Sequence, residues 1–369
     1  MNRNYCVRAG GGLSYKPATA YRLSLRAVLT GLVLVLCYSG VSSTGAQDSI
    51  TGEWILSTKP GTEFAHLTIQ RRTERYSNFM SSVEIRADII RGLTREQMAA
   101  SGAAVQFQIV RDAGTLNCEG WFKDGRGSGH FTFVPNQGYI ATMRGLGYDN
   151  LSTERVFALA VHDVSLVYIR ELSAAGYDRV SIDKLLAMRI HGVSIQFIND
   201  LKAAGYDRQP VDQLVAMRIH GVSIEFIREM KSLGYDEVSV DRLVAMRIHG
   251  VKTEFIKELK EMGYDSLPID QLVAMRIHGV KSEFMRELRE FGYDRVPLDE
   301  LVSMRIHGVS AEFIKELKGL GYDRVPVDQL VSMRIHGVNA AFIEKMRKRG
   351  FNDLSVEQLI SLRIHGFDR

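Results

Sequence analysis

The sequence predicts a mainly α-helical protein, an α/α solenoid of 29-residue two-helix repeats preceded by a small antiparallel β-rich domain. The first observation is the hexapeptide Met-Arg-Ile-His-Gly-Val, which recurs every 29 residues. Its unbroken copies begin at Met188, Met217, Met246, Met275, Met304 and Met333, and Leu-Arg-Ile-His-Gly-Phe begins at Leu362. A fixed period of this length is typical of stacked repeats. The second observation is that apolar residues alternate with polar ones between Ile50 and Val134, which predicts strands.

Residues 1–46 have the features of an export signal. The segment holds five basic and no acidic residues, an apolar run over residues 27–41, and small residues at Thr44-Gly45-Ala46. This order predicts a signal peptide, with an uncleaved N-terminal anchor formed by residues 27–41 as the alternative. We therefore expect an exported protein, periplasmic or extracellular, that contacts a membrane only through this segment.

Charge and cysteine content narrow the class of protein. The formal charge of +4 comes from the first 46 residues, and the remaining chain is close to neutral. Nucleic-acid binding normally needs a concentrated basic face, so we exclude that class. Cys118 is the one cysteine after residue 46. It is interpreted as a small buried residue of a strand, with a reactive thiol as the alternative.

Residues 47–134 are predicted to form a small sheet or sandwich with one short helix. Apolar residues at every second position mark about five strands: Leu67 and Ile69; Val83, Ile85 and Ile89; Val105, Phe107 and Ile109; Leu116, Cys118 and Phe122; Phe131 and Phe133. Thr94-Arg95-Glu96-Gln97 fits a capping box, which predicts a helix from Arg95 to Gly102. The glycine-rich segment 125–129 runs into a strand, so we interpret it as a hairpin turn and not a phosphate loop. His66 and His130 are interpreted as ordinary sheet residues.

Residues 135–369 are predicted to form about eight helical hairpins. In the second unit, the order is a turn at 176–179, a first helix over 182–191, Gly192 as its stop, and a second helix over 195–204 capped by Ser194. Two apolar stripes follow helical spacing: Ile182, Leu185, Leu186 and Ile190, then Phe197, Ile198, Leu201 and Ala204. Helices this short bury little surface alone, so each unit is expected to bury its stripes against its neighbours.

Arginine and histidine recur at fixed positions of the repeat and are the candidate binding residues. The arginines are Arg189, Arg218, Arg247, Arg276, Arg305, Arg334 and Arg363, and the histidines are His191, His220, His249, His278, His307, His336 and His365. Neighbouring repeats stack about 9 Å apart, too far for two histidines to share a zinc ion, so no metal is expected. Three interpretations stay open: helix C-capping and inter-repeat pairing, partner binding, and pH sensing.

No motif supports catalysis. The sequence contains no serine, histidine and carboxylate set, no His-Glu-x-x-His and no Cys-x-x-Cys. We therefore expect a protein that is not an enzyme and that needs no cofactor.

Most of the chain resembles part of a known family. The alternation of Gly-Tyr-Asp with Leu-Val-Ala-Met-Arg-Ile-His-Gly-Val, behind a strand-rich segment that contains Arg111-Asp112-Ala113-Gly114-Thr115-Leu116, resembles the extracytoplasmic C-terminal region of bacterial membrane metallopeptidases of the β-lactam sensor-transducer type. The resemblance covers roughly residues 52–369. The peptidase motif and the membrane spans of that family are absent from this sequence, so the resemblance implies an exported sensing or interaction module without catalytic residues.

Three functions fit these observations. The first is an exported scaffold that binds a protein or peptide along the helical repeats. The second is an envelope sensor whose β-rich domain binds a small molecule or cell-wall fragment, and the third is a structural spacer. Architecture alone does not decide among them.

Overall fold

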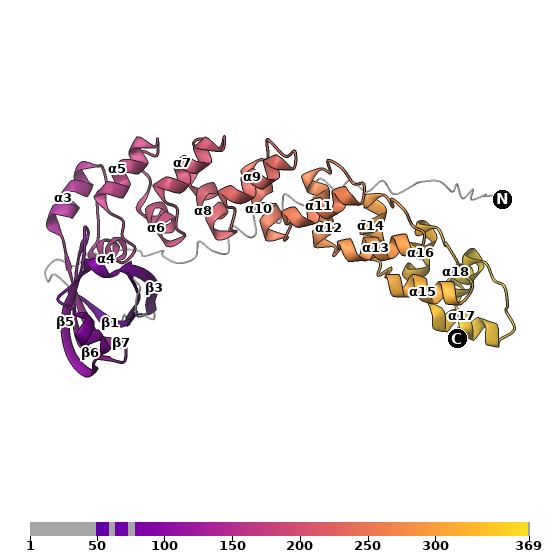
Figure 1. Cartoon of the computed structure of the whole chain (residues 1–369), viewed down its shortest axis with the longest axis horizontal. Coiled ribbons are helices and arrows are strands. Elements are labelled where there is room, and N and C mark those ends of the chain that lie inside the picture. Colours follow the sequence, from indigo (N-terminus) through magenta and orange to yellow (C-terminus); the bar gives the residue numbers. More distant parts are fainter. Residues whose placement is uncertain (1–48, 59–62, 73–77, 368–369) are drawn as a thin grey trace, which may run out of the picture. The chain divides into compact units, whose positions relative to one another are not determined.

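The computed structural model describes residues 49–58, 63–72 and 78–367. The predicted leader, residues 1–46, lies outside this part of the chain, and so does the proposed anchor at 27–41. An antiparallel sheet comes first and a regular series of helical hairpins follows it (Figure 1), which confirms the predicted fold class. No helix in the described ranges has the length and apolar character needed to span a bilayer.

The sheet has seven strands in the order β3-β2-β1-β7-β6-β5-β4, and all neighbours are antiparallel. Figure 1 shows that it is strongly curled. The strands are β1 (Ile50–Thr58), β2 (Phe64–Arg72), β3 (Asn78–Arg86), β4 (Ile90–Arg91), β5 (Ser101–Arg111), β6 (Gly114–Lys123) and β7 (Arg126–Pro135). A 3-10 helix, η1 (Ala87–Ile89), and α2 (Arg95–Ala99) interrupt the strand order.

Aromatic rings fill the inner side of the sheet. Trp54 of β1 is fully buried and meets the edge of Phe107, with 4.9 Å between the ring centroids. Gly127 gives room for the ring of Phe122, since a Cβ atom there would lie 2.4 Å from it. Cys118 of β6 lies in the same core, and burial raises the pKa of its thiol to about 12. Core packing fits these properties of Cys118 better than a reactive role does.

Three details of the sheet differ from the prediction. The prediction missed strand β1 because its sequence does not alternate strictly between apolar and polar residues. Gly52 occupies an inward position, and the exposed residue between Trp54 and Leu56 is the apolar Ile55. Ile89 belongs to η1 and not to a strand. The capping box of Thr94 and Gln97 is present, but α2 ends at Ala99, where the chain turns extended to enter β5. A hairpin turn is present as predicted, but it consists of Asp124 and Gly125, and residues 126–129 of the glycine-rich segment belong to β7.

The repeats form sixteen helices in the described part of the chain, as the sequence predicted. First helices carry even numbers: α4 (Thr153–Val161), α6 (Ile182–Ile190), α8 (Val211–Ile219), α10 (Val240–Ile248), α12 (Ile269–Ile277), α14 (Leu298–Ile306), α16 (Val327–Ile335) and α18 (Val356–Ile364). Second helices carry odd numbers: α3 (Gln137–Gly145), α5 (Leu166–Ala174), α7 (Ile195–Ala203), α9 (Ile224–Ser232), α11 (Thr253–Glu261), α13 (Ser282–Glu290), α15 (Ala311–Gly319) and α17 (Ala340–Lys348).

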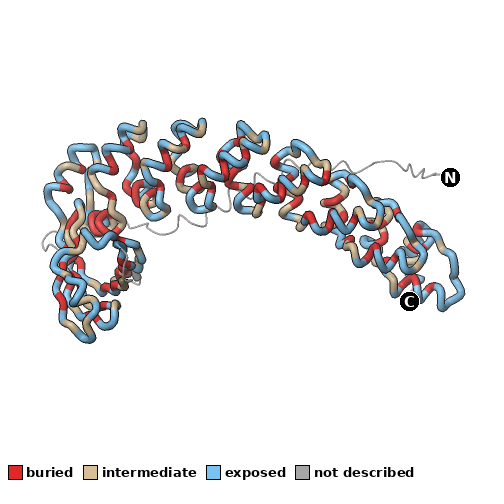
Figure 2. The backbone as a smooth tube through the Cα atoms, in the orientation of Figure 1, coloured by how far each residue is buried: buried red, intermediate tan, exposed pale blue. Residues whose placement is uncertain are grey.

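Most hairpins begin and end their helices with the predicted kinds of residue. The exceptions are Lys252 and Lys281, which precede α11 and α13 without a side-chain cap, and Asp163, which replaces the glycine after α4. In the second unit, Gly192 ends α6 with a φ of +70°, a value that glycine adopts without strain. The Ser194 hydroxyl then accepts a hydrogen bond from the Phe197 N–H at 3.1 Å and caps α7. Leu185 and Phe197 are buried between units, as predicted, and Figure 2 shows buried positions recurring along the whole array.

Tyrosine hydroxyl groups connect consecutive units. In each Gly-Tyr-Asp turn from Tyr177 onward, the hydroxyl donates to a backbone carbonyl 32 residues later at 2.7–2.8 Å. The pairs are Tyr177 with Gln209, Tyr206 with Val238, Tyr235 with Leu267, Tyr264 with Val296, Tyr293 with Val325, and Tyr322 with Leu354. The last such turn carries Phe351, which has no hydroxyl to donate and packs edge to face on Phe367. The repeated tyrosine therefore has a structural role between units.

Candidate binding surface on the repeat array

The arginine row lies between units. Each guanidinium group stacks over an aromatic ring on the second helix of the preceding unit, with 5.0–5.2 Å from its carbon to the ring centroid. The pairs are Arg189 on Tyr168, Arg218 on Phe197, Arg247 on Phe226, Arg276 on Phe255, Arg305 on Phe284, Arg334 on Phe313, and Arg363 on Phe342. A cation over a ring face is attracted by the ring quadrupole, so each arginine holds two units together.

Helix geometry explains why these arginines point towards the preceding unit. At about 100° per residue, Arg189 falls between Leu185 and Leu186 on the buried side of α6. From there its Nε donates to the His162 carbonyl at 3.2 Å, and Arg218 Nε approaches the His191 carbonyl at 3.4 Å. Arg189 and Arg218 thus satisfy helix C-terminal carbonyls, which supports the structural interpretation at these two positions. The Nε atoms of Arg276 and Arg305 have no hydrogen-bond partner among the described residues.

The histidine row occupies the C-cap of every first helix, and it becomes more exposed along the array. His191 is half-buried, and burial lowers the pKa of its imidazole. His307, His336 and His365 are exposed. Within the described ranges, no three histidine, cysteine or carboxylate side chains lie close enough together to hold a metal ion.

A row of isoleucines between the arginines and histidines is exposed to solvent. Its members are 39–57% exposed: Ile190, Ile219, Ile248, Ile277, Ile306, Ile335 and Ile364. The prediction that Ile190 belongs to the buried stripe was wrong. Met188 of the same hexapeptide is fully buried in its place. Each isoleucine falls beside the first-turn aspartate or glutamate of its helix, on the side away from the core, so periodicity alone did not separate Ile190 from Met188.

The isoleucines belong to a repeated surface that we call the first-helix face. In the second unit it consists of Asp183, Lys184, Ala187, Ile190 and His191, and equivalent residues continue it in the following units. Between α16 and α18 the same positions line a groove of about 440 Å³. Two isoleucines, Ile360 and Ile364, and six polar residues line this groove.

Polar side chains cross this face from one first helix to the next. Lys184 Nζ pairs with Asp212 at 3.0 Å, and the Arg242 guanidinium pairs with Asp270 at 2.9 Å. Glu300 interrupts the series because it faces Asp328. Burial, together with the charges of Asp299 and Asp328, raises the pKa of Glu300. The first-helix face is therefore more acidic at this unit than elsewhere.

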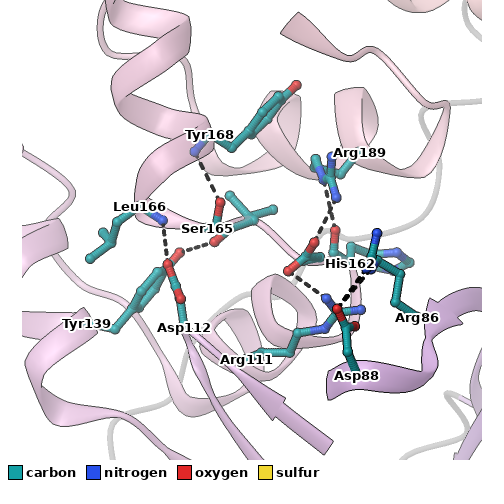
Figure 3. A network of polar contacts seen from close by, with 12 residues as sticks. Arg86, Asp88, Arg111, Asp112, Tyr139, His162, Ser165, Leu166, Tyr168 and Arg189 are labelled. Atoms are coloured by element: carbon teal, nitrogen blue, oxygen red, sulfur yellow. Dashed lines mark hydrogen bonds and ion pairs between the residues drawn. The ribbon is translucent and has the colours of Figure 1, made fainter. Parts of the chain in front are cut away.

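The first unit departs from the repeat where it meets the sheet. Asp163 stands at the position of Gly192, and its carboxylate binds Arg111 of β5 at 2.9 Å and Arg189 of α6 at 3.0 Å. The Asp112 carboxylate accepts a hydrogen bond from Leu166 N–H at the start of α5 (Figure 3). The Arg-Asp pair of the β5–β6 hairpin thus joins sheet to array, which gives this motif a structural role.

Comparison with known proteins adds no family assignment. No protein-family model matches the chain, and no curated protein is similar to it in sequence. The resemblance to sensor-transducer metallopeptidases stays a prediction.

Proposed function

We propose that this protein is an exported, non-enzymatic scaffold that binds a protein or peptide along the first-helix face. One observation carries the proposal: an isoleucine at the same position of seven consecutive units is 39–57% exposed. Single exposed apolar residues are ordinary. Seven of them at the same repeat position form a row along one face, and this regularity supports the proposal of an interaction site. The arginines of the row are half-buried or exposed and pack on aromatic rings of the preceding unit, so we assign the contact surface to the isoleucines instead.

The spacing of the isoleucines suggests the conformation of the partner. Packed helices lie about 8–10 Å apart, so isoleucines of adjacent units are separated by about the same distance. A polyproline II segment rises about 3.1 Å per residue with three residues per turn, so every third side chain points the same way at about 9 Å intervals. A segment in this conformation with an apolar residue at every third position matches the row.

Charge on the first-helix face favours a basic partner. Its first-turn position is acidic in each of the seven units from the second to the last: Asp183, Asp212, Asp241, Asp270, Asp299, Asp328 and Glu357. In these seven units the neighbouring position supplies two cations, Lys184 and Arg242, and adds Glu300. Lysine or arginine residues between the apolar residues of the partner would complement these carboxylates, and binding would weaken as salt increases.

Peptide selection on the whole array tests the proposal. The chain from Gln47 is used to enrich a random 15-residue peptide library, and the peptides are rescreened on a variant with Ile219, Ile248 and Ile277 changed to serine. We expect enriched peptides with an apolar residue at every third position, basic residues between, and at least tenfold weaker binding to the variant. In the control variant, Glu225, Glu254 and Glu283 are replaced instead, three residues that are exposed on second helices. This variant should bind the enriched peptides as tightly as the parent chain does. Enrichment that the isoleucine variant retains, or no enrichment, would contradict the proposal.

A further inference from the structure

The outer face of the sheet carries two polar rows that the scaffold function does not use. Strand register places the rows across β5, β6, β7 and β1: Gln106, Glu119, His130 and Glu53 in one, and Gln108, Asn117, Thr132 and Thr51 in the next. The alternate residues Phe107, Cys118 and Phe131 are buried on the other side. Both rows therefore face solvent, side by side.

A hollow of about 490 Å³ lies over these rows. Six polar side chains of the two rows line it, and Arg91 of β4 closes one side. This volume falls within the range of pockets that hold small ligands. The hollow is open and polar, so a ligand that fits it must itself be polar over much of its surface.

Buried groups fix the floor of the hollow. Gly120 and Gly129 face each other across β6 and β7, and a Cβ atom on Gly129 would lie 1.9 Å from the Glu119 carbonyl. The indole N–H of Trp54 donates to the carbonyls of Glu119 and His130 at 3.1 and 3.0 Å. The side chains of Glu119 and His130 therefore line the hollow from a backbone that Trp54 and the glycine pair hold in place. Such preorganisation lowers the entropy cost of binding.

Most of the polar groups around the hollow are free to bind a ligand. Gln108 Nε2 donates to Asn117 Oδ1 at 2.8 Å, which orders these two amides and leaves further donors and acceptors on both. Among the described residues, no side-chain partner is found for Gln106, Glu119 or His130. A carboxylate can accept two hydroxyl groups, and an amide can both donate and accept.

Charge and an adjacent aromatic ring define the ligand class. The hollow has one carboxylate, Glu119, and one guanidinium, Arg91, so its charges balance. A phosphate or other strong anion would meet a single arginine and be repelled by Glu119. Trp121 lies two residues from Glu119 on the same side of β6 and is 63% exposed. Its electron-rich ring face can attract the C–H groups of a sugar ring.

From these features we propose that the outer face of β5, β6 and β7 binds a neutral oligosaccharide, with hydroxyl groups held by Glu119, Gln106 and His130 and a sugar ring stacked on Trp121. The site is independent of the first-helix face. Oligosaccharide binding by the sheet and peptide binding by the first-helix face can therefore be tested separately, and either proposal can be wrong without the other.

Calorimetric titration of the chain from Gln47 tests this site. The probes are chitotriose, cellotriose and maltotriose, and pull-down on insoluble chitin, cellulose and starch distinguishes a short free sugar from a longer polymer. We expect saturable binding of at least one trisaccharide or polymer, weakened at least tenfold by Glu119→Ala and by Trp121→Ala.

Two variants on the outer face of β3, Glu84→Ala and Met80→Ala, serve as controls and should bind as the parent does. Circular dichroism would verify that all four variants are folded. The proposal is overturned if none of the six probes binds, or if Glu119→Ala and Trp121→Ala bind as tightly as the two controls.

Discussion

Replacing Arg218 by alanine tests whether the arginine row holds the units together. The guanidinium lies 5.2 Å from the ring centroid of Phe197, and its Nε is 3.4 Å from the His191 carbonyl. A cation–π contact at a partly exposed site contributes about 1 kcal/mol, and a long hydrogen bond contributes about 0.5–1 kcal/mol. We expect Arg218→Ala to destabilise the contact between α6, α7 and α8 by about 2 kcal/mol.

Hydrogen exchange measured by mass spectrometry is the appropriate assay, because a repeat array need not unfold in one step. Peptides covering α6 to α8 report the local free energy of opening, and peptides from α14 to α18 act as an internal reference. Arg228→Ala is the matched control, since Arg228 is exposed on α9. Exposed substitutions of this kind usually change stability by less than about 0.5 kcal/mol.

A double-mutant cycle with Phe197→Leu isolates the ring contact. We expect a coupling free energy of about 1 kcal/mol between Arg218 and Phe197. If Arg218→Ala costs no more than Arg228→Ala and the coupling is near zero, then the arginines do not stabilise the array. The row would in that case be available for a partner, and the structural interpretation would be wrong.

Three further predictions follow from charge and register. Glu300→Lys should stabilise its unit by about 0.5 kcal/mol, because the new lysine can pair with Asp328. Hydrogen exchange in this unit should become slower, and unchanged or faster exchange would contradict the prediction. Burial, and to a lesser degree the charge of Arg189, lowers the pKa of His162 to about 4. The neutral form is therefore favoured in the folded state, and stability present above about pH 6.5 should fall by up to about 3 kcal/mol as pH drops to 4. His162→Gln should reduce this dependence of the unfolding free energy on pH, measured by urea titration at several pH values. An unchanged pH dependence in the variant would mean that other groups cause it. Deleting residues 234–262, one whole unit, should leave the helicity per residue unchanged in circular dichroism. Deleting 15 residues from the same unit should lower the helicity per residue, because the repeat register is lost.

The repeat architecture was predictable because its period is long, its helix ends carry strong local signals and its units are nearly identical. Gly192 and Ser194 mark helix ends by backbone conformation and side-chain capping, which depend on neighbouring residues alone. The exposure of Ile190 depends on how helices of different units pack. A nine-residue helix with both Met188 and Ile190 does not show from its own sequence which of them faces the core.

The sheet was harder to predict because contacts distant in sequence determine it. Gly52 and Gly127 each interrupt a strand pattern, yet each leaves room for an aromatic ring from the neighbouring strand. The hollow beside Glu119 and His130 arises from the register of four strands. Spacing along one strand contains no sign of it, and His130 was interpreted as an ordinary sheet residue for that reason.

Site-specific photo-crosslinking in the producing cells tests the scaffold proposal most directly. A benzoylphenylalanine is placed at Ile219, Ile248 or Ile277 on the first-helix face, and in matched controls at Glu225, Glu254 or Glu283 on the second helices. The proposal predicts that the three isoleucine positions give the same adduct and that the glutamate positions give none. Equal adducts at both sets, or adducts at the glutamate positions alone, would contradict binding along the first-helix face.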